Sequence, residues 1–260
     1  MMKRIYRSEY SVFGPVDGKL ANQTIDVQTI VNTINCRGVM GTGLALEFRL
    51  RYPKMYEDYK LRCEKGLVRV GRPYLYNLEK PYILNFPTKD HWKYPSKLEW
   101  IEEGLKYFAD NYKSLNIKSI AFPKLGTDKG GLNWRDVKKL IEKYLKDVEI
   151  PVFICYDKKP DLIEQKMIQQ INSLGDSQEL KEQLEKAGIK RYVIKSIVDN
   201  LPIERFRDLI VIEGVGSRSY EKLHNFFYNR CKFAQGSNVE STRKYQARLN
   251  HFFDLETRMP

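Results

Sequence analysis

Lys89 is the residue of this sequence that we single out for covalent chemistry. It lies in the segment NFPTKDHWKYP, directly before Asp90 and His91. A lysine amine that is held near other cations, or is shielded from water by apolar neighbours, can lose its proton and act as a nucleophile or base. Lys93 and Lys124 are candidate cations, whereas a nearby carboxylate would keep the amine charged. The sequence leaves open which effect wins, and whether Lys89 is simply a solvated lysine.

Two glycine-rich stretches offer places for a phosphate. The first, VNTINCRGVMGTGLALEF (residues 31–48), has glycines at 38, 41 and 43 before a helix-like apolar pattern. The second, KLGTDKGG, carries Gly126, Gly130 and Gly131. Glycine lets backbone N–H groups approach a phosphate closely, and a helix N-terminus adds a favourable partial charge. One such loop alone is more often a tight turn, but two of them beside the Lys89 segment predict a diphosphate site.

The segments around these loops alternate between strand and helix. The sequence predicts strands over residues 24–35, two short strands around Lys80–Pro81, and strands at IKSIAFP and IPVFICY. It predicts helices over residues 44–66, interrupted near Pro53, and at LNWRDVKKLIEKYLKD. Ser96 and Glu99 have capping-box spacing at the start of one more helix. This alternation predicts an α/β protein whose sheet is covered on both faces.

Three loops leave predicted strands toward helices, at residues 36–43, 87–95 and 123–131. Ligands of such sheets bind beyond the carboxyl ends of the strands. If the three strands are neighbours, we expect the three loops to meet at one rim.

The alternation stops near Lys158–Asp161, so we predict one domain over residues 1–158 and a small all-α domain over residues 161–260. Within the second, IERFRDLIVIEGVGSRSYEKLHNFF resembles a helix-hairpin-helix motif, in which a glycine turn and the next helix hold a DNA phosphate. The resemblance marks Gly214, Gly216 and Arg218 as DNA-binding candidates. An ordinary helix–turn–helix connection would show the same pattern, and Tyr220 stands where the motif has a small residue.

Composition narrows the classes of protein. The chain is 42% hydrophobic, has no apolar run long enough to cross a bilayer, and starts without the apolar core of a secretory signal, so we expect a cytoplasmic protein. Four cysteines far apart and three histidines indicate neither a disulfide framework nor a metal site.

The net charge of +12 is concentrated in the first 160 residues, which hold 29 basic and 19 acidic residues. Residues 161–260 hold 16 basic and 14 acidic residues. Near the end of the chain, residues 229–253 interleave basic with aromatic side chains. A basic face of this size suits a polyanion such as nucleic acid, although scattered lysines would give the same total.

Three motifs carry a resemblance to a known family. VNTINCRGVMGTGLALEF, ILNFPTKDHW and IAFPKLGTDKGGLNW together resemble the macrodomain of the DarG type, an antitoxin that removes ADP-ribose from DNA bases modified by the toxin DarT. The resemblance spans roughly residues 17–156. More distantly, the chain is similar to the terminal ADP-ribose protein glycohydrolase. The resemblance implies a macrodomain fold, a three-layer α/β/α sandwich with a mixed central sheet.

The resemblance also implies roles for residues. Lys89 becomes the catalytic candidate, and Asn35 is expected on the distal ribose. The two glycine loops are expected to hold the diphosphate, through Gly41, Thr42, Gly43 and Leu44 in the first and Thr127, Asp128, Lys129, Gly130 and Gly131 in the second. No metal or cofactor is implied, since ADP-ribose is ligand and product.

The sequence departs from the family pattern at two places. Macrodomains of this kind usually have Gly-Asp-Leu after the first strand, whose aspartate holds the adenine amine, but here Gly18–Leu20 reads GKL, with Asp17 displaced. The protein-directed relative has an aspartate in the second glycine loop, and the aligned residue here is Gly130, with Asp128 two positions earlier. DarG-type domains manage without that aspartate, so this departure favours the DNA-directed branch.

The resemblance therefore predicts an ADP-ribosylglycohydrolase that acts on ADP-ribosylated DNA. Such an enzyme would be the antitoxin of a DarT-like toxin, would take part in DNA repair and would have no membrane partner. The segment after the DarG macrodomain blocks the toxin and is expected to be acidic, whereas residues 161–260 are nearly neutral. The alternatives are a non-catalytic ADP-ribose reader, a nucleic-acid-binding adaptor, and a hydrolase of ADP-ribosylated protein.

Overall fold

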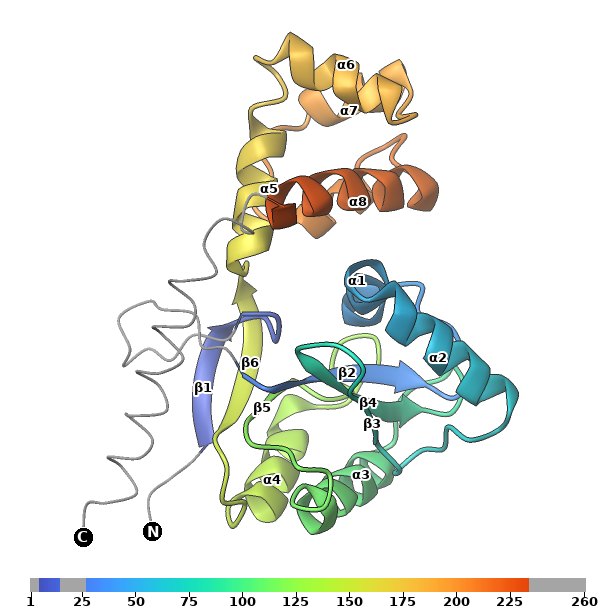
Figure 1. Ribbon diagram of the computed structural model, residues 1–260, viewed down its shortest axis with the longest axis vertical. Coiled ribbons are helices and arrows are strands. Elements are labelled where there is room, and N and C mark those ends of the chain that lie inside the picture. Colours follow the sequence, from blue (N-terminus) through green and yellow to red (C-terminus); the bar gives the residue numbers. More distant parts are fainter. Residues whose placement is uncertain (1–4, 15–26, 234–260) are drawn as a thin grey trace, which may run out of the picture. The chain divides into compact units, whose positions relative to one another are not determined.

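The computed structural model describes residues 5–14 and 27–233 (Figure 1). The chain divides into two compact units, with the boundary after Asp161. Three sequence features lie outside the described residues: the GKL triplet of residues 18–20, the start of the strand expected from residue 24, and the basic and aromatic residues after 233. The described residues contain no helix that is long and apolar enough to cross a membrane.

The first unit is built on a mixed sheet of six strands, in the order β1-β6-β5-β2-β4-β3 (Figure 1). All neighbouring strands are parallel except β3 and β4, which are antiparallel. The strands are β1 Ile5–Tyr10, β2 Thr29–Asn35, β3 Tyr74–Tyr76, β4 Tyr82–Lys89, β5 Ile120–Pro123 and β6 Val152–Lys159. The sequence did not predict β1, which pairs with the carboxyl-terminal strand of the unit.

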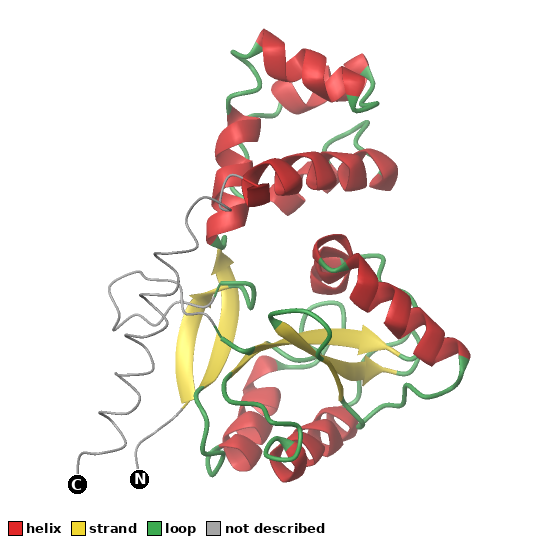
Figure 2. Cartoon of the chain, viewed as in Figure 1, coloured by secondary structure: helices red, strands yellow, loops and turns green. Residues whose placement is uncertain are grey.

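Helices cover both faces of this sheet (Figure 2). α1 Gly43–Arg51 and α2 Pro53–Glu64 lie on one face, and α3 Leu98–Asn111 and α4 Trp134–Leu145 on the other. The predicted interruption near Pro53 is confirmed, because α1 ends at Arg51 and α2 begins with the proline. Proline has no N–H to donate and fits the first position of a helix. The predicted three-layer α/β/α sandwich is therefore present.

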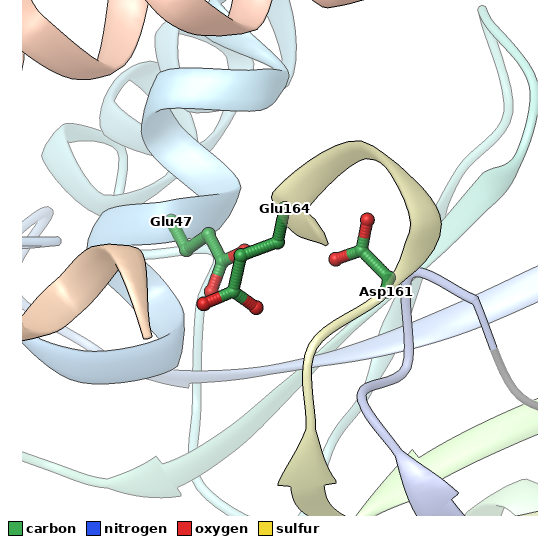
Figure 3. A group of neighbouring side chains, drawn as sticks. All are labelled: Glu47, Asp161 and Glu164. Atoms are coloured by element: carbon green, nitrogen blue, oxygen red, sulfur yellow. The ribbon is translucent and has the colours of Figure 1, made fainter. Parts of the chain in front are cut away.

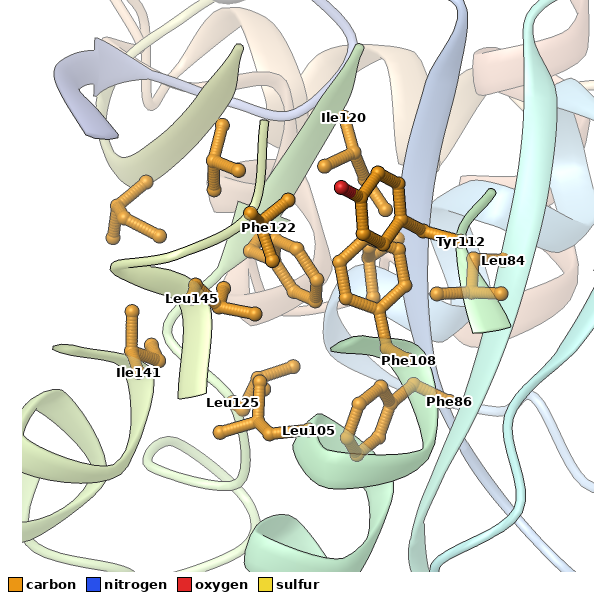
Figure 4. Close-up of a cluster of buried hydrophobic side chains, with 14 of the residues drawn as sticks. Leu84, Phe86, Leu105, Phe108, Tyr112, Ile120, Phe122, Leu125, Ile141 and Leu145 are labelled. Carbon is orange, nitrogen blue, oxygen red and sulfur yellow. The ribbon is translucent and has the colours of Figure 1, made fainter. Parts of the chain in front are cut away.

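The main core lies between the sheet and the α3–α4 layer (Figure 4). α3 buries Ile101, Leu105 and Phe108, which share one face of the helix at spacings of four and three residues. At Gly104 a β-carbon would collide with the ring of Phe86, so only glycine lets α3 pack this closely on β4. This close contact fixes the helix that follows the Lys89 segment.

The predicted capping box at the start of α3 is wrong. The helix begins at Leu98 with Lys97 as its N-cap, and no side chain caps it. The N–H of Ser96 instead donates to the carbonyl oxygen of Gly130, at 2.9 Å. A tertiary contact with the second glycine loop has thus taken the residue that local spacing assigned to a cap.

The regular elements of the second unit are all helices within its described residues, as predicted. Its elements are α5 Leu162–Asn172, α6 Gln178–Lys186, α7 Arg191–Val198, the 3-10 helix η1 Phe206–Val211 and α8 Ser217–Phe233. The turn at Gly214 and Gly216 follows a 3-10 helix rather than the apolar α-helix expected of the hairpin motif. Tyr220 is buried, with its ring centroid 6.0 Å from that of Phe206, so the large residue forms part of this core.

Candidate active site

The three loops that the sequence placed at one rim do meet there. β5, β2 and β4 are adjacent and parallel, so their carboxyl ends lie at the same edge of the sheet. The N–H of Cys36 in the first loop donates to the carbonyl oxygen of Asp90, at 3.1 Å. Ser96 bonds Gly130 of the third loop, as described above. The rim is therefore one connected structure built from segments far apart in the sequence.

An irregularity in the β2–β4 pairing sets the position of Lys89. Ile34 pairs with Pro87, but the next residue of β2, Asn35, pairs with Lys89. Thr88 is the extra residue of this bulge, and its hydroxyl lies 3.5 Å from the carbonyl oxygen of Ile34. Bulges re-aim the side chains beside them. Lys89 and Asn35 consequently end their strands side by side.

The Lys89 amine points to the second glycine loop, where it donates a hydrogen bond to the carbonyl oxygen of Lys129. Burial lowers the pKa of Lys89, and the carboxylate of Asp128 opposes this by favouring the charged amine. The carboxylate of the adjacent Asp90 instead pairs with Arg37, at 2.8 Å. Burial thus settles the direction that the sequence left open, and it increases the share of neutral amine.

Asn35 organises the first glycine loop. Its side-chain oxygen accepts a hydrogen bond from the N–H of Arg37 at 2.9 Å, and its amide group donates to the carbonyl oxygen of Val39 at 2.6 Å. The hydroxyl of Tyr59 donates to the backbone oxygen of Asn35 at 2.8 Å. These bonds hold the loop against β2. The expected contact of Asn35 with the distal ribose stays a prediction.

The first glycine loop runs into the N-terminus of α1. Thr42 is the N-cap in an extended conformation, and Gly43 has a φ of +58°. The first N–H groups of a helix, here those of Gly43 and Leu44, have no acceptor within the helix. Around Gly41 and Gly43 the nearest atom to an added β-carbon would be 3.8 Å away. The backbone is therefore open to a group such as a phosphate, which a helix N-terminus favours.

The second glycine loop is folded tightly on itself. The N–H of Gly131 donates to the carbonyl oxygen of Asp128 at 3.1 Å, and that of Leu132 donates to Gly126 at 3.0 Å. The Thr127 hydroxyl donates to the carbonyl oxygen of Lys124 at 3.0 Å. A β-carbon on Gly130 would lie 2.6 Å from the carbonyl carbon of Gly126. No side chain fits at position 130 in this loop, so the aspartate of the protein-directed relative is excluded there.

Asp128 belongs to the second glycine loop, and its carboxylate lies close to the first. Its Oδ2 lies 3.8 Å from the point where a β-carbon would stand on Gly43. It also acts on Lys89 electrostatically. The structure thus brings together Lys89, Asp128 and the start of α1 from three separate loops.

His91 packs with its neighbours in the loop after Lys89. Its Nδ1 accepts a hydrogen bond from the N–H of Lys93, at 3.2 Å. Its ring stacks on Trp92 and tilts against Tyr94, with centroid distances of 5.4 and 5.3 Å. The sequence interpretation missed Tyr94 and the Arg37–Asp90 ion pair. The alternation of basic and aromatic residues around Tyr94 was a signal in the sequence that could have identified this residue.

The far end of α1 is anchored by charge. Arg51 is buried and pairs with Glu47 at 2.6 Å and with Asp161 at 2.7 Å; Figure 3 shows both carboxylates. The hydroxyl of Ser11 donates to the same oxygen of Asp161, at 3.4 Å. The helix whose N-terminus faces the rim is therefore held at its other end by the last residue of the first unit.

Comparison with known proteins agrees with this geometry. Residues 31–141, which include both glycine loops and Lys89, match the Macro domain family. The solved macrodomain of Mycobacterium tuberculosis DarG is 35% identical, with a TM-score of 0.52, and the match covers 58% of this chain and 96% of that one. The first unit is a macrodomain of the DarG type. The predicted family and fold are thereby confirmed.

Two curated relatives of this macrodomain are longer proteins. The DNA ADP-ribosyl glycohydrolase of Thermus aquaticus is 46% identical over 127 residues, which are 47% of this chain and 35% of that protein. A DNA ADP-ribosyl transferase–DNA ADP-ribosyl glycohydrolase fusion protein of Thermosipho africanus is 38% identical over 147 residues, or 49% of this chain and 38% of that protein. The chain spans just over a third of the length of these relatives.

Proposed function

We propose that the macrodomain removes ADP-ribose from ADP-ribosylated DNA bases by hydrolysing the N-glycosidic bond. The observation that carries this proposal is the position of Lys89, whose pKa is lowered by burial and which lies between two glycine loops at one rim. The names of the Thermus and Thermosipho relatives support DNA as the substrate. The closed backbone at Gly130, which has no room for an aspartate, favours DNA over protein as the carrier of the ADP-ribose.

The chemistry follows from a neutral amine beside a bound ribose. The diphosphate would lie at the N–H groups of Gly43 and Leu44, with the ribose near Lys89. Cleavage passes through an oxocarbenium-like state at the ribose carbon. The amine lone pair forms a bond to that carbon while the bond between the carbon and the base breaks, and the base leaves with the electron pair and takes up the proton that the amine loses. Water then releases ADP-ribose and restores the amine.

Replacement of Lys89 tests this chemistry. We expect Lys89→Ala to keep ADP-ribose affinity within about tenfold, ~1.4 kcal/mol, in calorimetry. We expect its single-turnover release of ADP-ribose from a modified oligonucleotide to fall by roughly 10³-fold. Lys89→Arg should fail as well, because a guanidinium stays charged and cannot be the nucleophile.

Two results would redirect the proposal. Release at the wild-type rate by Lys89→Ala would replace the lysine with a water activated by Asp128 or His91. A wild-type chain that binds ADP-ribose but releases none from DNA would be a reader rather than a hydrolase.

We also propose that the chain acts as an antitoxin to a DarT-like toxin. The Thermosipho relative supports this pairing, since its name joins a DNA ADP-ribosyl transferase to the glycohydrolase. Co-expression with such a transferase tests it. If the enzymatic role suffices, the wild-type chain should restore growth and Lys89→Ala should not. Rescue by Lys89→Ala would instead assign protection to a binding surface, for which residues 162–233 are the candidate.

A further inference from the structure

The loop that follows Lys89 exposes aromatic side chains which the proposed chemistry does not use. We call residues 91–97, with the sequence HWKYPSK, the aromatic loop. Trp92 is 48% exposed and Tyr94 is 65% exposed. Large exposed apolar side chains gathered at one place mark interaction sites. Two exposed aromatic side chains beside a candidate active site therefore indicate a surface that binds a partner.

The aromatic loop is held in its shape by its own bonds. The N–H of Tyr94 donates to the carbonyl oxygen of His91, and the N–H of Lys93 donates to the His91 ring, both at 3.2 Å. The His91 ring lies against Trp92 and Tyr94. At its other end, Ser96 is bonded to Gly130 of the second glycine loop. The exposed rings are thus presented by a braced loop.

The charge of the aromatic loop is positive. Lys93 lies over the Trp92 ring at 5.1 Å from the centroid, and Lys97 lies over Trp100 at the same distance. The loop contains no acidic residue, and the preceding Asp90 is paired with Arg37. Exposed aromatic rings interleaved with lysines are the pattern that binds single-stranded nucleic acid, by stacking on bases and by contact with phosphates.

The place of the aromatic loop also fits a nucleic-acid chain. It begins two residues after Lys89 and ends on the glycine loop whose Lys129 carbonyl accepts from the Lys89 amine. The aromatic loop therefore borders the place proposed for the ribose, close to where the modified base would be attached. Faces of bases are available for stacking only when the bases are out of a duplex.

We propose that the aromatic loop is a stacking platform that binds the unpaired nucleotides flanking the modified base. Trp92 and Tyr94 stack on bases, and Lys93 and Lys97 contact phosphates. The proposal rests on the proposed function in naming DNA as the carrier of ADP-ribose. It goes beyond that function because it identifies the residues that hold the strand on either side of the modified base.

The test uses the full chain and an unmodified single-stranded oligonucleotide of mixed sequence, with fluorescence anisotropy at low salt. We expect the double variant Trp92→Ala/Tyr94→Ala to bind the strand about tenfold more loosely. The variant Trp92→Phe/Tyr94→Phe should keep most of the affinity, because phenylalanine still stacks. ADP-ribose binding in calorimetry should stay within twofold for both variants.

Matched controls lie elsewhere in the first unit. Leu78 is 80% exposed in the connection between β3 and β4, so Leu78→Ala removes an exposed apolar side chain away from the aromatic loop. Lys118 is exposed and precedes β5, at the opposite edge of the sheet from the rim, so Lys118→Ala removes an equivalent charge. Neither change should alter strand affinity, whereas Lys93→Ala should reduce it and weaken its dependence on salt.

The outcomes separate this proposal from the proposed function. Unchanged strand affinity in the alanine double variant would overturn the platform. So would loss of ADP-ribose binding together with strand binding, which would make the aromatic loop a structural support. If the wild type releases no ADP-ribose from DNA but strand binding still depends on Trp92 and Tyr94, the hydrolase proposal fails and the platform stands. If the alanine double variant hydrolyses a modified single strand at the wild-type rate at low substrate concentration, the hydrolase proposal is supported and the platform is wrong.

Discussion

The two glycine loops of the macrodomain have similar compositions but use glycine for different reasons. In the first loop, an added β-carbon on Gly41 or Gly43 would meet its nearest neighbour at 3.8 Å. In the second loop, a β-carbon on Gly126 would lie 2.9 Å from Leu132, and one on Gly130 would collide with the backbone of Gly126. The first loop therefore keeps its backbone open to a ligand, while the second packs its backbone against itself.

Backbone hydrogen bonds show the same difference. The N–H groups of Gly43 and Leu44 begin a helix and have no acceptor within it. In the second loop the N–H of Gly131 already donates to the carbonyl oxygen of Asp128. We infer that the first loop supplies most of the contacts to the diphosphate, and that the second mainly positions Asp128 and the partner of Lys89. Counting glycines would have made the two loops equal.

The largest effect that sharpens this comparison is expected from Gly43→Glu. A carboxylate beside the open helix N-terminus would repel the diphosphate, and the φ of +58° disfavours any side chain. We expect ADP-ribose affinity to fall at least ~100-fold, about 2.7 kcal/mol, in calorimetry. Gly66→Glu is the matched control, since Gly66 has a φ of +68° and open surroundings at the end of α2. Unchanged affinity in folded Gly43→Glu would remove the first loop from the site.

The second prediction concerns stability instead of binding. Gly130→Ala forces a methyl group into the packed loop, and overpacking of this kind costs about 1–3 kcal/mol. We expect the melting temperature to fall by roughly 6 °C. Gly131→Ala, whose β-carbon would meet no atom within 4 Å, should cost less despite its φ of +76°. A loss at Gly130→Ala no larger than that at Gly131→Ala would show that the loop relaxes around the methyl group and that Gly130 is not tightly packed.

A smaller effect is expected from Asp128→Asn, which tests the carboxylate between the loops. Asp128 raises the pKa of Lys89 against the lowering by burial, so its removal lowers that pKa further. If the neutral amine is the active form, turnover rises as pH rises toward the Lys89 pKa, and this rise should move to lower pH in the variant. Turnover at neutral pH should increase a few-fold, because an exposed carboxylate contributes ~1 kcal/mol or less. A pH–rate profile that does not move would separate Asp128 from Lys89.

The smallest effect extends the comparison to the glycine turn of the second unit. Gly216 is open and lies directly before α8, and Gly43 is likewise open and is the first residue of α1. If this turn holds a DNA phosphate, Arg218→Ala should lower duplex affinity and reduce the slope of log affinity against log salt by about one. Filter binding at several salt concentrations measures it. A slope unchanged from wild type would leave this turn as an ordinary helix connection.

The sequence by itself determined the local features of this protein. Alternating strand and helix patterns predicted the layers, the break at Pro53 and the rim at which three loops meet. These signals are readable because strand and helix periodicity, and the effects of proline and glycine, depend on near neighbours in the chain. Lys89 and the two glycine loops could be picked out for the same reason.

Only the tertiary structure decided how those features are used. The capping-box spacing of Ser96 was overridden by its bond to Gly130, 34 positions further along the chain. The bulge at Thr88 places Lys89 beside Asn35, and burial, opposed by Asp128, lowers the pKa of its amine. Which glycines are open and which are packed depends on the atoms that distant segments bring against them. These properties are set by contacts between residues far apart in the sequence, and local pattern carries no information about such contacts.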